Sequence, residues 1–176
     1  NPETNTKCSS SEAVSTTGTK TGCMKWYVFN YDGSEKVNLI LDHNTTANVA
    51  WSSDDSNITG PKVANAQLES DTSSWNSSLN ARLIEASEIA KITENSGWTA
   101  GGEYYYFHTN STTKYTGEAG TNKYAWLFDN TTACTTSGCN VATTGVNGYW
   151  TGTGRTDNTR YSWYVRGDGT LYCHIF

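Results

Sequence analysis

The chain of 176 residues has the length of a single domain, carries a formal net charge of −5 and contains only 16% charged residues. Ser, Thr and Asn account for 63 of the 176 residues, while Phe, Trp and Tyr make up 12%. The apolar runs are too short to cross a bilayer, and an acidic balance without a Lys/Arg run argues against a nucleic-acid partner. The aromatic content excludes full disorder. These figures favour a β-rich domain with a neutral polar surface, as is common outside the cell.

The N-terminal quarter of the chain predicts a tether followed by a hairpin. Residues 1–21 are polar and lack a hydrophobic period, which is typical of a linker, so we expect the folded domain over residues 22–176. Residues 23–31 and 35–42 are rich in aromatic and β-branched side chains and predict two strands joined by a turn at Gly33. Three apolar residues are expected to share one face of the second strand: Val37, Leu39 and Leu41.

Two short helices are expected next. The first begins at Pro61, which suits a first helical position, and runs to about Ser70. Val63 and Ala66 are expected on its apolar face, with Ala64 as a further candidate. The second follows an extended segment at residues 83–84. Its apolar residues recur at helical i, i+3, i+4 spacing, and its first turn is acidic, as the helix dipole favours. The residues of this pattern are Ala86, Ile89 and Ala90, with Glu85 and Glu88 in the first turn.

The second half of the chain returns to short strands. Aromatic segments at 103–108, 123–129, 148–152 and 161–166 predict four of them, separated by long Gly-, Thr- and Asn-rich loops. A Gly-Asp-Gly turn at 167–169 then leads into a last strand. The element order predicts an α+β fold with two short helices, a twisted and mainly antiparallel sheet, and long loops.

Five cysteines in this setting suggest an oxidising compartment. Cys134 and Cys139 flank a four-residue loop and are expected to pair, as are Cys8 and Cys23, although five cysteines leave fifteen pairings open. Cys173 is then the odd one. No His pair lies near a Cys at the spacing of a zinc finger, so we expect neither a metal site nor a cofactor.

Several motifs carry a resemblance to a known family. Residues 82–89 (RLIEASEI) resemble the R-L-P-T-E-A-E-W signature of formylglycine-generating-enzyme-like domains, and residues 163–173 (WYVRGDGTLYC) resemble their R-x-R-G-G-S-W segment. In the same order, the strings GCMKWY, LDHNTT, ARLI, YAWL and GYWTGT resemble secreted domains of gut Firmicutes. Over residues 22–172 the chain is thus similar to C-type-lectin-like domains, a group that includes the variable proteins of diversity-generating retroelements.

The resemblance implies a C-type-lectin-like fold whose loop-rich half faces a ligand. The sequence departs from the motif where Ile84 and Glu85 replace Pro-Thr and Ile89 replaces Trp. In that fold the last strand pairs with the first. Here residues 170–176 or another chain would have to supply that partner, and an unpaired edge would invite strand addition.

We expect no catalytic role for the other motifs that could carry chemistry. Cys173-His174 follows the turn where the related enzymes carry their first catalytic Cys, but the second Cys of that pair is missing here. The carboxylates that could add to a Ca²⁺ site lack the strings of sugar-binding lectins and are expected to be solvated. These carboxylates are those of Asp54, Asp55 and Asp129. His43 and His108 fit no catalytic triad. Arg166-Gly167-Asp168 is interpreted as a hairpin turn rather than an integrin-binding motif.

The expected binding site lies between residues 149 and 170, where Tyr, Trp and Arg crowd together. These side chains offer rigid contact area and dominate recognition surfaces. Trp150 and Trp163 are expected in the core. The predicted ligand-binding residues are Tyr149, Arg155, Asp157, Asn158, Arg160, Tyr161, Tyr164 and Arg166.

Three functions are compatible with these motifs. The first is a secreted or surface-displayed bacterial domain for adhesion or recognition, not an enzyme, whose partner is a protein or a glycan on another surface. The second is the globular head of a pilin-like filament subunit that self-associates through its C-terminal strand or Cys173. The third and most remote is a formylglycine-generating-type oxidase. None of them involves nucleic acid or membrane contact by these residues.

Overall fold

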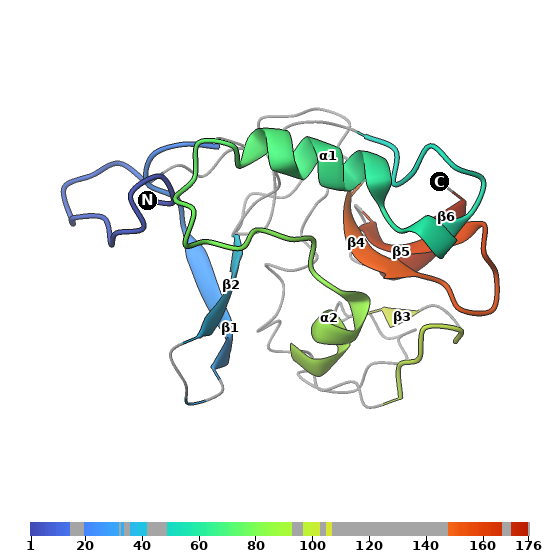
Figure 1. Cartoon of the computed structure of the whole chain (residues 1–176). Coiled ribbons are helices and arrows are strands. Elements are labelled where there is room, and N and C mark those ends of the chain that lie inside the picture. Colours follow the sequence, from blue (N-terminus) through green and yellow to red (C-terminus); the bar gives the residue numbers. More distant parts are fainter. Residues whose placement is uncertain are drawn as a thin grey trace.

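In the computed structural model the described residues form two short helices, a one-turn 3-10 helix (η1) and two antiparallel sheets (Figure 1). The mixed helix and strand composition confirms the expected fold class, whereas the C-type-lectin-like assignment stays a prediction. Of Tyr31, Tyr105, Tyr106, Arg166 and Thr170 only the backbone is described. The described residues are 1–14, 20–31, 33, 36–41, 49–92, 97–102, 105–106, 148–166 and 170–175.

The first sheet is the hairpin expected from the sequence. Strand β1 (Trp26–Tyr31) pairs with β2 (Val37–Leu41) in antiparallel register, with a bulge between Val28 and Asn30. The hairpin stands apart from the second sheet (Figure 1). Val28 and Leu39 are direct cross-strand partners, and both are exposed, as is Val37. The apolar face predicted from Val37 and Leu39 therefore points largely to solvent.

Helix α1 (Lys62–Asp71) begins after Pro61, which is its N-cap residue. Ala64 is buried while Ala66 is exposed, so the predicted apolar face was wrong at Ala66. The reason is Trp51, which is fully buried and whose carbonyl accepts a hydrogen bond from the Ala64 N–H at 3.3 Å. This long-range contact, rather than helical periodicity, decides which side of α1 faces inward.

The second sheet is four-stranded and antiparallel, in the order β3-β6-β5-β4. Its strands are β3 (Tyr105–Tyr106), β4 (Gly148–Gly154), β5 (Tyr161–Arg166) and β6 (Thr170–Ile175). The hairpin of β5 and β6 was expected. Because β6 pairs with β5 and β3, while β1 pairs with β2, no described strand makes the first-to-last pairing of the lectin-type fold.

Helix α2 (Ala86–Ile92) covers one face of this sheet and forms the hydrophobic core with it. Ala86, Ile89 and Ala90 are all buried, which confirms the periodicity seen in the sequence. On the sheet side, successive side chains along each strand point to opposite faces while direct cross-strand partners share a face, so that one set of β5 and β6 side chains points at the helix. The buried residues of the sheet in this core are Trp163, Val165, Leu171 and Cys173.

The N-terminal segment contacts the rest of the chain at several points. The Asn76 N–H donates to the Pro2 carbonyl at 2.8 Å, the Trp75 indole donates to the Lys20 carbonyl at 2.7 Å, and Lys20 pairs with the buried Asp71 carboxylate. These contacts place Pro2 and Lys20 against residues 71–76, at the end of α1 and just beyond it. The domain boundary at residue 21 stays a prediction. None of the helices in the described part of the chain is long and apolar enough to span a membrane.

Candidate functional site

The segment between β4 and β5, residues 155–160, is an ordered loop with an exposed rim, called the 155–160 loop below. The Arg155 N–H donates to the Tyr161 carbonyl at 2.9 Å and closes the loop across its base. Asn158 supports the tip, because its side-chain oxygen accepts from the Arg160 N–H at 3.0 Å and its carbonyl accepts from the Tyr161 N–H at 3.2 Å. Asn is favoured at such positions because its side chain can bond to the backbone two residues on.

Asn57, in η1 (Asn57–Thr59), clamps this loop from the side. Its side-chain Nδ2 lies within hydrogen-bonding distance of three carbonyl oxygens, those of Arg155 at 2.8 Å, Asn158 at 3.2 Å and, at the start of β5, Tyr161 at 2.7 Å. Its backbone N–H donates to the Thr159 carbonyl at 2.6 Å. One residue, about a hundred positions away in the sequence, thus binds three carbonyl groups of the loop, those of Arg155, Asn158 and Thr159, and that of Tyr161 at the start of β5.

Gly154 makes room for this clamp. A Cβ atom at position 154 would lie 2.9 Å from Cβ, Cγ and Nδ2 of Asn57, closer than real Cβ contacts come. A larger residue there would displace Asn57 from the carbonyl groups. The Asn57–Gly154 contact is therefore the structural condition for the loop conformation.

Arg155 is used inside the molecule rather than displayed. Its guanidinium forms a two-pronged ion pair with the Asp157 carboxylate, and its Nη1 donates to the Cys173 sulfur at 2.8 Å. The hydrogen bond from Arg155 lowers the pKa of Asp157, and the same bond raises the pKa of Arg155. Burial raises the pKa of the Cys173 thiol, against the opposing effect of Arg155. Cys173 is thus a buried, neutral thiol that packs in the core.

The predicted site residues divide into several environments. Tyr149 and Tyr161 are partly buried and pack against the hydrophobic core, where burial raises the pKa of the Tyr149 hydroxyl far above its usual range. Tyr164 lies on the other face of the sheet, where its ring contacts those of Trp150 and Tyr172. The side chain of Arg166 lies outside the described residues. The structure does not bring these residues into one surface.

Three of the predicted residues are exposed on the loop itself: Asp157, Asn158 and Arg160. Ile58 stands beside them, because Asn57 binds the loop and the next side chain, 79% exposed, points to solvent. We define the display surface as Ile58, Asn158, Thr159 and Arg160. Sequence reasoning missed Asn57 and Ile58, and no local pattern in residues 53–60 could have placed them against a strand so distant in the sequence.

Of the two core tryptophans expected here, Trp163 is fully buried, and its indole donates to the Ala100 carbonyl at 3.0 Å. Trp150 is only partly buried and donates to the Val49 carbonyl at 2.7 Å. Asp54 is engaged by Lys62 and Thr59, and the hydrogen bond from Lys62 lowers its pKa. Among the other residues interpreted from the sequence, those outside the described residues are His43, His108, Asp129, Cys134, Cys139, Gly167 and Asp168.

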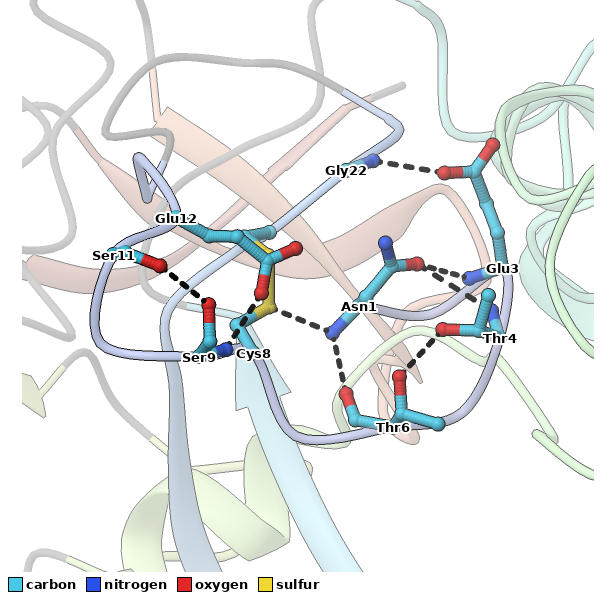
Figure 2. The surroundings of a disulfide bond; sticks show 10 residues. Asn1, Glu3, Thr4, Thr6, Cys8, Ser9, Ser11, Glu12 and Gly22 are labelled. Carbon is cyan, nitrogen blue, oxygen red and sulfur yellow. Dashed lines mark hydrogen bonds between the residues drawn. A yellow bond between two sulfur atoms is a disulfide. The ribbon is translucent and has the colours of Figure 1, made fainter.

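A second group of polar and sulfur-containing side chains surrounds the N-terminal disulfide (Figure 2). Cys8 and Cys23 are bonded, as expected, with Cα atoms 6.0 Å apart. The Glu12 carboxylate lies over the sulfur atoms, and one ligand atom from each of these three residues falls within 4.8 Å of the others. Glu12 is held there by the Ser9 N–H at 2.6 Å, which lowers the pKa of the carboxyl group.

Comparisons of the chain with protein-family models, with curated proteins and with solved structures find no match. The likeness to C-type-lectin-like domains therefore stays a prediction from the order of the sequence motifs.

Proposed function

We propose that this chain is an extracellular recognition domain that binds a protein or glycan through the display surface. The observation that carries the proposal is the clamped 155–160 loop. Asn57 occupies the backbone carbonyl groups of Arg155, Asn158 and Thr159, while the side chains of Asn158, Thr159 and Arg160 remain exposed. A loop that is already ordered loses little conformational entropy when a ligand binds.

The composition of the display surface suits a ligand with both polar and apolar groups. Arg160 supplies a cation and several hydrogen-bond donors, Asn158 offers an amide, and Ile58 adds an apolar contact. The Cys8–Cys23 disulfide agrees with an oxidising, extracellular setting. The proposal is narrower than the surface expected from the sequence, because Tyr149, Tyr161 and Arg155 serve the internal structure.

Ligand capture on arrays of glycans and surface proteins tests this proposal. Arg160→Ala and Asn158→Ala should each weaken every hit by about tenfold or more, if these residues form the centre of the interface, where the few residues that cost more than about 1 kcal/mol on truncation cluster. Lys91→Ala is the matched control, because it removes an exposed cation from α2, away from the loop. Hits that survive both loop variants at full strength would show that the site lies elsewhere.

A filament subunit is the second candidate, and one observation favours it. Val28 and Leu39, paired across the β1–β2 hairpin, are 64% and 45% exposed, and Val37 is 48% exposed. Such a strip of apolar side chains is typical of a surface that packs against another chain. Sedimentation of the wild type and of Val28→Lys tests this alternative. A concentration-dependent oligomer that Val28→Lys dissociates would support it, and a strict monomer would count against it.

The oxidase alternative gains no support from the site of Cys173. Cys173 is 1% exposed, and its sulfur accepts a hydrogen bond from the Arg155 guanidinium. An enzyme of that type would need a second thiol beside it and an open path for substrate. Cys173 is also too deeply buried to form a disulfide with another chain unless the sheet opens.

A further inference from the structure

The N-terminal segment folds into a cross-linked clip formed by residues 1–12 and 20–23 (Figure 2). Cys23 lies just before β1, and the preceding Gly22 has a positive φ of 77° and donates its N–H to the Glu3 carboxylate at 2.9 Å. The Trp75 indole fixes the same end of the clip, because its N–H donates to the Lys20 carbonyl. Cys23 is therefore held by the body of the domain, while Cys8 belongs to the segment that folds over it.

Glu12 is the unexpected member of this clip. Residues 9–12 form a turn in which the Glu12 N–H donates to the Ser9 carbonyl at 3.2 Å, while the Glu12 carboxylate accepts from the Ser9 N–H. The turn directs the carboxylate back over the two sulfur atoms (Figure 2). A disulfide has no proton to donate to a carboxylate. The Ser9 N–H therefore holds the carboxylate in this place, and the disulfide adds no hydrogen bond to it.

Two thiolates and a carboxylate are the ligands of a zinc-class cation. Zinc takes sulfur ligands at about 2.3 Å and carboxylate oxygens at about 2.0–2.2 Å, and sites with three protein ligands keep a fourth position for water. Tetrahedral geometry at these lengths separates the sulfur atoms by about 3.8 Å. The Cα atoms of Cys8 and Cys23 lie 6.0 Å apart, so after reduction rotation of the side chains can bring the sulfur atoms to this separation while the backbone stays in place.

We propose that, after reduction of the disulfide, Cys8, Cys23 and Glu12 bind one zinc-class cation. A dithiol reductant supplies two electrons and two protons, becomes a disulfide itself and leaves two thiols on the chain. The cation then displaces both thiol protons to solvent and binds the thiolates together with the carboxylate. The loop between Cys8 and Cys23 is closed by a sulfur–sulfur bond in one state and by the metal in the other.

Protection of the cysteines from alkylation tests this site in the full chain. The protein is reduced with a phosphine, incubated with or without Zn²⁺, briefly alkylated and mapped by mass spectrometry. Zinc should slow the labelling of Cys8 and Cys23 together by at least tenfold. Protection confined to the other cysteines, or labelling that zinc leaves unchanged, would overturn the proposal.

The role of Glu12 has a matched control in the same segment. Glu12→Gln should weaken zinc protection at least tenfold, because an amide is a poorer ligand than a carboxylate. Glu3→Gln removes the same charge nearby but keeps an oxygen that accepts from the Gly22 N–H, so protection should persist. Titration of the reduced chain with Co²⁺ gives a second measurement. The near-ultraviolet absorbance of the cobalt–thiolate bonds should saturate at one equivalent of cobalt. Equal protection in Glu12→Gln and wild type, or no such absorbance, would also overturn the proposal.

Discussion

The core between α2 and the four-stranded sheet and the 155–160 loop are built by different forces, although β4 and β5 lead into both. The core is held together by apolar side chains that are fully buried, among them Ile89, Trp163 and Leu171. The loop has an exposed rim and keeps its shape through the polar contacts of Asn57. Burial of apolar area stabilises strongly and without direction, whereas hydrogen bonds contribute little net energy but define a geometry. The core is thus expected to decide whether the chain folds, and Asn57 to decide what the loop presents.

The largest effect is expected in the core. Ile89→Ala should lower the free energy of unfolding by about 3 kcal/mol, because a buried Ile loses its transfer energy and leaves a cavity. The same substitution at Ile58, which is 79% exposed, should change stability by no more than about 0.5 kcal/mol. Urea unfolding of the two variants measures the difference. Similar losses at both positions would refute the assignment of stability to the core.

An intermediate effect is expected at the loop. Asn57→Ala should cost about 1–2 kcal/mol, since it leaves carbonyl groups of the loop without their donor. Gly154→Ala should cost about 1–3 kcal/mol, since its Cβ would collide with the Asn57 side chain. Asn57→Ala removes two of the three atoms that a Cβ at position 154 would meet, Cγ and Nδ2, and keeps only the Asn57 Cβ. The double variant should therefore lose about 1 kcal/mol less than the sum.

Denaturation of the two single variants and the double variant completes this cycle. Asn65→Ala, on the exposed side of α1, is the control for loss of an Asn side chain and should be nearly neutral. Both loop variants should also lose ligand capture while remaining folded. Strict additivity would show that Asn57 and Gly154 do not act through their mutual contact.

The same contrast explains what the sequence could predict. The buried face of α2 follows from local periodicity, because Ala86, Ile89 and Ala90 recur at the spacing of one helix face. Turn signals and β-branched residues likewise placed both hairpins, β1–β2 and β5–β6. Element type therefore follows from neighbours along the chain.

Contacts between segments that lie far apart in the sequence could not be predicted from a local sequence pattern. Asn57 binds residues about a hundred positions away. The residues next to Asn57 in the sequence show no hydrophobic periodicity or motif that would predict this contact. Arg155 was predicted to bind ligand because it lies in a segment crowded with Tyr, Trp and Arg, the side chains that dominate recognition surfaces. Only the fold shows that Asp157 and Cys173 already occupy it. Glu12 was missed for the same reason, since its carboxylate meets Cys23 only once the clip is closed.

The smallest effect is expected at the polar start of α2, where Arg82 contacts Glu88 through both guanidinium Nη atoms and the Glu85 N–H donates to the same carboxylate at 2.9 Å. Burial favours a higher pKa for Glu88, but Arg82 and the Glu85 N–H outweigh it and lower the pKa of this carboxyl. The native state therefore releases the Glu88 proton more readily than the unfolded chain does, so the contribution is present above the ordinary pKa and is lost as the pH falls through the native value. Because the pair is partly exposed to solvent, Glu88→Gln should cost only about 0.5 kcal/mol at pH 7 and nothing near pH 2, as measured by urea unfolding at both values. Arg82→Gln should reproduce the loss at pH 7 and add nothing in the double variant. A loss that persists at pH 2 would mean that Glu88 acts by packing and not by charge, and the polar contacts of α2 would then belong with its core.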